Sequence, residues 1–131
     1  MDAPRQSLVV FAKKKAPVSA FYLQTLGLTT IESEPSHDLL RGPGIELVIH
    51  AIPAEYAADI AIATPPERRE DAAFKPAFLV EDLEAVRRAA LATGGFLEPK
   101  ARAWRMGNAV VLDGTDPEGN VVQFRQSGSS G

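Results

Sequence analysis

Apolar residues near the start of the chain follow two different periods in succession. Residues 7–12 (Ser-Leu-Val-Val-Phe-Ala) form a short, β-branched apolar run that is typical of a buried strand. Pro17 then suits the first turn of a helix, because the amide hydrogen that proline lacks would have no partner there. One face of this helix is marked by side chains at helical spacing, namely Val18, Phe21, Tyr22 and Thr25. Gly27 supplies a left-handed end, so the pattern predicts a strand followed by a helix.

The same order of elements returns at residues 75–95. Residues 77–80 (Ala-Phe-Leu-Val) are again a short apolar strand, and Asp82 can cap the helix that follows. An offset of 68 positions superposes the two segments. The coinciding pairs include Ser7 with Lys75, Phe11 with Leu79, Val18 with Val86 and Gly27 with Gly95. Strand start, helix face and helix end all agree, which indicates an internal duplication.

Three further strands are predicted after each helix. Their expected ranges are 28–34, 38–42 and 45–51 in the first half, and 96–99, 108–113 and 120–126 in the second. Turn signals separate the last two strands of each half, at residues 42–44 and 116–120. The second hairpin is longer, so the final strands align with an offset of 77 positions, which places Glu46 on Gln123.

These elements predict a single α+β domain over residues 1–126. It contains two tandem β-α-β-β-β repeats, at about 7–52 and 75–126, which form a cupped mixed sheet with the helices on its outer face. The linker at about 53–74 is rich in proline and charge, and residues 56–62 within it fit either a short helix or an extended segment. Residues 127–131 read as a flexible tail or a cloning scar.

Composition narrows the functional classes. The 131 residues are 45% hydrophobic, which suffices for a core, and they include no cysteine, which excludes disulfides and thiolate chemistry and fits a cytoplasmic protein. A net charge of −3 argues against a nucleic-acid partner. No apolar run is long enough to span a membrane, so we expect a soluble protein with no membrane partner.

Three segments carry a resemblance to a known superfamily. They are the helix end Ala20-Phe21-Tyr22 with Leu26-Gly27-Leu28, the strand and cap at residues 78–83, and the closing hairpin at residues 116–124 (Asp-Pro-Glu-Gly-Asn-Val-Val-Gln-Phe). The chain resembles the vicinal oxygen chelate superfamily over residues 7–126. That superfamily includes glyoxalase I, bleomycin-resistance proteins and extradiol dioxygenases. The resemblance implies a glyoxalase-like fold that serves several chemistries and also pure binding.

Enzymes of this superfamily hold a divalent metal with four side chains, from the first and last strands of each half. Carried over by position, the resemblance gives Ser7, Glu46, Lys75 and Gln123. Only Glu46 is a good ligand, because serine and glutamine bind transition metals poorly and lysine repels them. We therefore expect no metal and no other cofactor, with a divalent metal as the alternative.

A metal-free pocket for a small organic molecule is the first functional hypothesis. Alternation along the strands predicts that its lining includes Ser7, Val9, Phe11, Glu46, Val48, His50, Lys75, Ala77, Leu79, Gln123 and Arg125. His50 shares the Glu46 face but lies ~13 Å along the strand, too far for one metal. His37 is expected in a turn. Trp104, in a basic segment, either stacks on a planar or anionic ligand or covers the open end of the sheet.

Alternative hypotheses use the same residues differently. Glu46 and Lys75 can serve as base and electrophile in proton abstraction beside a carbonyl, or form an ion pair in place of the lost metal. A metal-dependent glyoxalase-like lyase, isomerase or dioxygenase needs ligands from elsewhere, such as His50 or a partner chain. A purely structural module is disfavoured, because burying four polar groups without purpose costs free energy. The resemblance also implies a homodimer.

Overall fold

The computed structural model describes residues 4–128 and contains two β-sheets. The four-stranded first sheet has the order β1-β4-β3-β2, and the five-stranded second sheet runs β5-β9-β8-β6 with β7 also paired to β8. The first sheet and its helix comprise β1 (Ser7–Ala12), α1 (Lys15–Leu26), β2 (Thr29–Glu34), β3 (His37–Gly42) and β4 (Ile45–Ala51). The second comprises β5 (Ala77–Val80), α3 (Leu83–Ala92), β6 (Phe96–Leu97), β7 (Trp104–Met106), β8 (Ala109–Thr115) and β9 (Val121–Ser127). The predicted fold class is confirmed.

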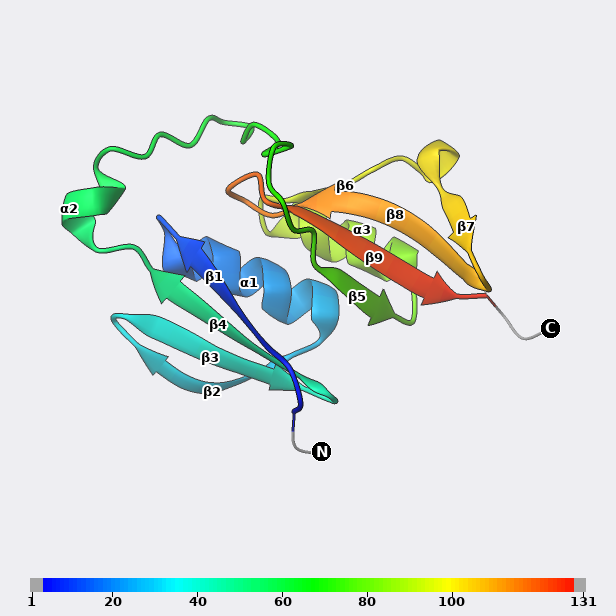
Figure 1. Cartoon of the computed structure of the whole chain (residues 1–131), viewed down its shortest axis with the longest axis horizontal. Coiled ribbons are helices and arrows are strands. Elements are labelled where there is room, and N and C mark those ends of the chain that lie inside the picture. Colours follow the sequence, from blue (N-terminus) through cyan, green and yellow to red (C-terminus); the bar gives the residue numbers. More distant parts are fainter. Residues whose placement is uncertain (1–3, 129–131) are drawn as a thin grey trace.

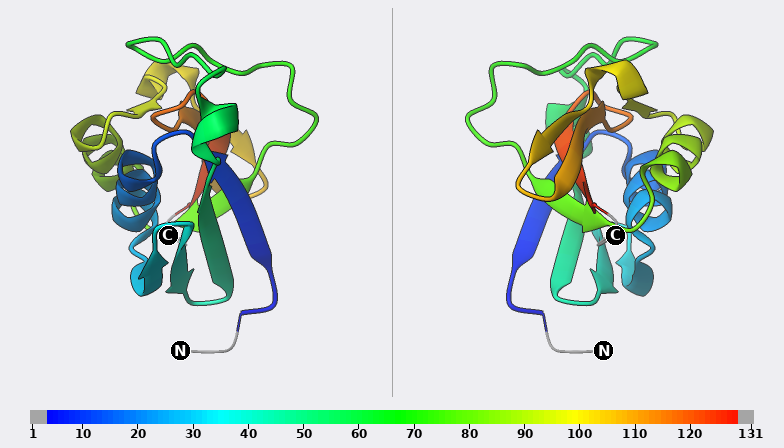
Figure 2. Two further views of the ribbon diagram at one scale, coloured as in Figure 1. Left: turned by 90° about the vertical axis from the view of Figure 1, so that its left-hand side faces the viewer. Right: turned by 90° about the vertical axis from the view of Figure 1, so that its right-hand side faces the viewer.

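Both long helices lie on one side of the molecule and both sheets lie on the other. Figure 1 views the sheets from the front with α1 and α3 behind them, and the side views in Figure 2 show the two helices together on one flank. The sheets sit next to each other, and each first strand pairs in parallel with the last strand of its sheet. The faces of the sheets that the helices do not cover therefore point to the same side.

Local sequence accounts for the helix ends. Gly27 adopts φ 66°, and its N–H donates to Leu23 O at the end of α1. Asp82 caps α3 through Oδ1, which accepts the Glu84 N–H at 2.9 Å. Both features were predicted, because glycine is the residue that most readily adopts a left-handed conformation and aspartate is a strong N-cap. None of the helices within residues 4–128 has the length and apolar character needed to cross a bilayer.

One aromatic cluster joins the two repeats into a shared core. Phe21 and Tyr22 of α1 pack edge to face with ring centroids 4.9 Å apart. Phe21 also contacts Phe124 of β9, and Tyr22 contacts Phe78 of β5. The approach is close enough that a Cβ at Gly95 would lie 2.4 Å from the Phe21 ring. The helix of the first repeat is therefore packed against strands of the second.

The turn between β8 and β9 adds a polar connection between the repeats. Glu118 is buried, and its two carboxylate oxygens accept the N–H groups of Lys13 and Lys14 at 2.8 and 2.7 Å. These amides belong to the N-cap residue of α1, Lys14, and to the residue before it, and Lys14 provides no side-chain cap for the helix. Asp116 is also buried and accepts the Tyr22 hydroxyl at 2.8 Å. Burial raises the pKa of Asp116 in spite of the hydrogen bonds that it accepts.

Several local predictions need correction. His37 was expected in a turn, but it begins β3 opposite His50, because the turn closes at residues 35–36. The short strand β7 and the 3-10 helix Lys100–Arg102 were not predicted, since three residues are too few to show a period. Residues 56–62 contribute only the end of the short helix α2 (Ala54–Ala57). Ser127 is not part of a tail but ends β9, while residues 129–131 lie outside the described residues.

We predict that Glu118→Ala destabilises the protein by about 2 kcal/mol, because two amides at the start of α1 lose a charged acceptor and remain desolvated. Chemical denaturation followed by circular dichroism measures this change. Glu34→Ala, on exposed strand β2, serves as the control and should cost less than about 0.5 kcal/mol. Equal effects of the two substitutions would show that the turn does not cap α1.

Candidate functional site

The candidate site is the face of the two sheets opposite the helices, called here the open face. Burial along the strands alternates as predicted: Leu47 and Ile49 are buried in the core, whereas Val9 and Phe11 are exposed. The predicted lining residues that lie on strands of this face are Ser7, Val9, Phe11, Glu46, Val48, His50, Ala77, Leu79, Gln123 and Arg125. The period-2 prediction of which side chains share a face is therefore confirmed, although their role in ligand binding remains a prediction.

Glu46 occupies the first-sheet part of the open face, where β1, β3 and β4 lie side by side. The strand register places it between Ser7 of β1 and Arg41 of β3. Arg41 Nη2 donates to Glu46 Oε1 at 2.9 Å. This hydrogen bond, and next the Ser7 hydroxyl, lower the pKa of Glu46 below its ordinary value. Glu46 is therefore an ionised, paired carboxylate, and its partner is within its own sheet.

Lys75 does not occupy the position that the repeat alignment assigned to it. Backbone hydrogen bonds run from Glu46 N–H to Gln6 O and from Gln123 N–H to Pro76 O. Gln6 and Pro76 are thus equivalent, and the residue that matches Ser7 is Ala77, two positions after Lys75. The offset of 68 failed here because it was fixed on the helices, and strand β5 is two residues shorter than β1, while two residues separate strand from helix in both repeats.

The ammonium group of Lys75 instead contacts Asp113, at 3.0 Å from Oδ2. Asp113 lies on β8 beside Gln123 and also accepts a longer contact, 3.4 Å, from Arg68 of the linker. Its Oδ1 atom is buried without a hydrogen-bond partner among the described residues. The expected Glu46–Lys75 pair is therefore wrong for this chain, because each group is paired within a different sheet.

The side chains at the expected metal position do not form a metal site. With Ala77 in place of Lys75, the four positions supply a hydroxyl, one carboxylate paired to Arg41, a methyl group and an amide. The Gln123 Oε1 atom accepts from Arg125 Nε at 2.6 Å. Within residues 4–128, no three His, Asp or Glu side chains are grouped so that they can hold a metal ion. This donor set does not fit the divalent metal that the resemblance implies.

Both histidines lie at the far end of the first sheet from Glu46. His37 and His50 face each other across β3 and β4. His37 Nε2 is 2.5 Å from Glu32 Oε2, and the His50 ring lies 5.6 Å from the Phe11 ring, centroid to centroid. His50 therefore belongs to the apolar part of the open face rather than to the Glu46 group.

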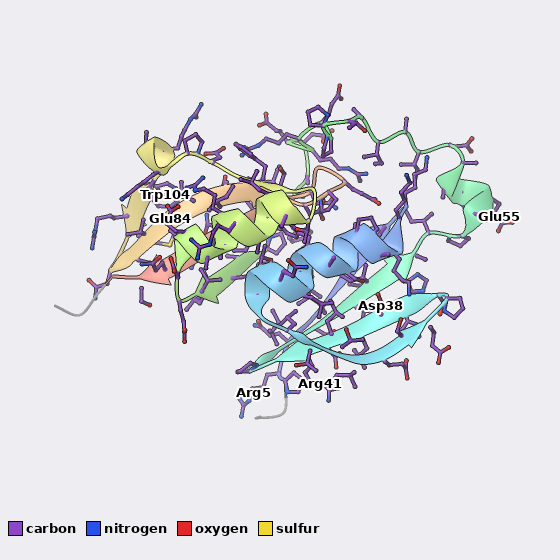
Figure 3. The ribbon with its side chains drawn as sticks, turned by 180° about the vertical axis from the view of Figure 1, so that it is seen from behind. Arg5, Asp38, Arg41, Glu55, Glu84 and Trp104 are labelled. Atoms are coloured by element: carbon purple, nitrogen blue, oxygen red, sulfur yellow. The ribbon has the colours of Figure 1, made fainter. Side chains whose placement is uncertain are left out.

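Trp104 lies on β7 at the outer edge of the second sheet. Its register partner is Val111, which is paired in turn to Arg125. These positions, with Leu79 of β5, form one row across the open face. Trp104 is half exposed, and Figure 3 places it far from Arg41 of the first sheet. It is thus available to a ligand near Arg125, at the other end of the face from Glu46.

Sequence reasoning missed three charged residues of this face, Arg41, Asp113 and Arg68. The position of Arg41 could have been predicted from the sequence. A two-residue turn at Pro43-Gly44 pairs Gly42 with Ile45 and therefore Arg41 with Glu46. The position of Asp113 could also have been predicted, from the alternation of side chains along β8. That of Arg68 could not, because this residue reaches the sheet from the irregular linker, whose path no periodicity describes.

We predict that Arg41→Ala raises the pKa of Glu46, so that its carboxyl group titrates at a higher pH. A carboxyl group with a lowered native pKa adds stability above its unfolded pKa and loses it as the pH falls through the native pKa, and the variant loses this contribution. The carboxyl carbon shift of Glu46, followed by NMR from pH 2 to pH 7, reports the titration. Lys75→Ala is the control and should leave the titration curve of Glu46 unchanged. A similar rise of the Glu46 pKa in Lys75→Ala would instead support a Glu46–Lys75 ion pair.

No protein-family model matches the chain, and no curated protein matches it in sequence. Solved structures do match it over nearly its whole length. A glyoxalase/bleomycin resistance protein/dioxygenase family enzyme from Burkholderia phytofirmans PsJN is 20% identical, with a TM-score of 0.65, over 95% of this chain and 99% of that one. The bleomycin resistance determinant of transposon Tn5 is 15% identical, with a TM-score of 0.62, over 95% and 98%.

The fosfomycin resistance protein FosX from Listeria monocytogenes is 13% identical, with a TM-score of 0.66, over 100% of this chain and 96% of that one. At such identities the likeness concerns the fold and not the activity. The predicted resemblance is confirmed at that level: the chain has the fold of the glyoxalase, bleomycin-resistance and fosfomycin-resistance proteins.

Proposed function

We propose that the chain is a small-molecule-binding protein that uses its open face without a metal ion and sequesters an organic, antibiotic-like compound. The observation that carries this proposal is the strand register at Glu46 and Gln123, which places a serine and an alanine where the resemblance implies metal ligands. The one carboxylate of the set is already bound to Arg41. Binding through apolar contacts and hydrogen bonds needs no such ligands.

The mixture of side chains on the open face supports a ligand role. Phe11, Leu79 and Trp104 are exposed apolar groups, and the Leu79 side chain is exposed to 77%. They share the open face with polar groups such as Glu46 and Arg125. Ligand sites combine apolar surface with a few placed polar groups in this way. Two structural neighbours are a bleomycin resistance determinant and a fosfomycin resistance protein, which favours an antibiotic-like compound.

We expect protein purified without a metal-affinity step to contain no stoichiometric metal by elemental analysis. Its melting temperature should not change with Zn²⁺, Ni²⁺, Mn²⁺ or Fe²⁺, whereas a compound that binds the native state should raise it by mass action, with about 2.7 kcal/mol gained at a hundred times Kd. Bleomycin and fosfomycin are the first compounds to test, followed by planar and anionic molecules. Stoichiometric metal or a metal-dependent shift would contradict the proposal and favour a metal-dependent lyase, isomerase or dioxygenase.

Binding at the open face is then separated from a structural role by Glu46→Ala. For a compound that binds, this variant should lose affinity while it keeps the native fold by circular dichroism. Glu34→Ala on β2 is a matched carboxylate control away from the Glu46 group. A variant that loses stability but keeps its affinity would make Glu46 a structural residue.

We propose further that two copies pair through their open faces. Strands β1 and β5 are edge strands of their sheets, and both are apolar. Their side chains Phe11 and Leu79 are exposed on the open face, and exposed apolar patches mark interaction surfaces. A second copy would cover Phe11 and Leu79 and enclose the ligand between two faces.

Sedimentation velocity tests the pairing. We expect a dimer for the wild type and a monomer for Phe11→Glu combined with Leu79→Glu, because two charges would be buried without partners. Leu91→Glu, at an exposed position of α3 on the helical side, is the matched control and should remain dimeric. A wild-type monomer, or a dimer disrupted equally by Leu91→Glu, would refute pairing through the open faces.

A further inference from the structure

A hollow lies between the two repeats, and two of its lining residues, Gln6 and Ile45, are the sequence neighbours of Ser7 and Glu46. It has a volume of about 640 Å³ and is bordered by the end of α1, the start of α3 and strand β5. These elements are seen from behind in Figure 3. We call it the inter-repeat groove. Its apolar walls include Leu26, Leu28, Ile45, Phe78, Val80 and Val86. A hollow of this volume with mostly apolar walls is within the range of small-molecule sites.

The charged groups that line the inter-repeat groove all have the same sign. Glu81 and Asp82 are its ionisable lining residues, and the lining contains no lysine, arginine or histidine. Asp82 uses Oδ1 to cap α3, which offsets the positive end of that helix. Glu81 is exposed, and its carboxylate has no hydrogen-bond or ion-pair partner among residues 4–128. The rim of the groove therefore carries negative charge with no basic side chain to balance it.

The end of α1 adds to this negative character. Residues 24–27 line the groove, and they form the last turn and the C-cap of the helix. An α-helix carries partial negative charge at this end, where its last carbonyl groups lack intrahelical partners. Lysine or arginine often balances such an end, but the last turn of α1 contains no basic residue. The end of helix α1 and the carboxylates of Glu81 and Asp82 thus both make the electrostatic potential in the groove more negative.

We propose that the inter-repeat groove binds an amphiphilic organic cation, with its apolar body between the repeats and its ammonium group beside Glu81 and Asp82. The apolar walls favour a hydrophobic body, and the one-sided charge selects an amine over a neutral or anionic compound of the same shape. Gln6 and Gln24 at the groove can accept further hydrogen bonds from the ammonium group. The site is separate from the proposed open-face function, although Ala77 and Leu79 border both the groove and the open face.

Three probes with one apolar body test the selectivity. These are 1-naphthylmethylamine, the neutral 1-naphthalenemethanol and the anionic 1-naphthoate, each titrated into isotopically labelled full-length protein at neutral pH. We expect the amine to bind about tenfold more tightly than either of the others, and added salt to reduce this preference. Amide shifts should concentrate at residues 24–28 and 77–86. Equal binding of naphthoate would overturn the proposal.

Charge-neutral variants separate the carboxylates from the apolar walls. Glu81→Gln combined with Asp82→Asn should weaken the amine about tenfold and leave the alcohol unchanged. Asparagine retains the helix cap, and an unchanged melting temperature checks this. Glu84→Gln, on the same helix but outside the groove, is the matched control and should bind the amine like the wild type. An equal loss of amine affinity in Glu84→Gln would show that the effect comes from the overall charge of the protein, and this result would overturn the proposed site.

The location of binding distinguishes this proposal from the open-face function. Glu46→Ala should leave amine binding intact, whatever it does to an open-face ligand. Amine-induced shifts centred on Glu46 and Arg125, and abolished in Glu46→Ala, would place the cation on the open face and refute the groove. Broadening of the groove resonances with protein concentration alone would show that a second copy occupies it, which would also refute the proposal.

Discussion

The arrangement of this molecule depends on how one turn of the second repeat holds the helix of the first. Glu118 accepts two amides at the start of α1, and Asp116 binds the hydroxyl of Tyr22 from the same helix. Both carboxylates are buried, so breaking these contacts would leave desolvated charges and amides. The contacts fix α1 against β5 and β9 while the aromatic rings close the core around them. The turn therefore does more than connect two strands, because it sets the position of one repeat relative to the other.

This position determines which surfaces remain for binding. With α1 and α3 packed together on one side, neither of these helices covers the opposite faces of the two sheets. The ends of the same helices border the inter-repeat groove. The open face carries charges of both signs, in pairs such as Glu46 with Arg41 and Lys75 with Asp113. The groove carries charge of one sign, so the two surfaces suit ligands of different character.

Sequence patterns specified the elements better than they specified the site. Strand alternation and the residues Gly27 and Asp82 fixed the faces and the helix ends, because each reflects a local rule of backbone geometry. The metal position was misassigned at Lys75, since only the hydrogen-bond register reveals that Pro76 matches Gln6. Strand β7 escaped notice because three residues show no period. The path of Arg68 to Asp113 depends on the tertiary packing of an irregular segment, which no local pattern encodes.

The pairing of charges on the open face also bears on how a ligand would bind there. Glu46 and Arg41 are partly exposed, and a partly exposed ion pair contributes little net stability. Replacing the Glu46–Arg41 ion pair by a contact with a polar group of a ligand therefore costs little free energy. Such a contact fixes the orientation of the ligand more than it adds to its affinity. Most of the binding free energy would have to come from covering apolar groups such as Phe11 and Leu79, which are exposed in the single chain. The open face of one chain covers a small molecule on one side only, so tight binding requires a second surface, and a second open face is the surface with matching apolar groups.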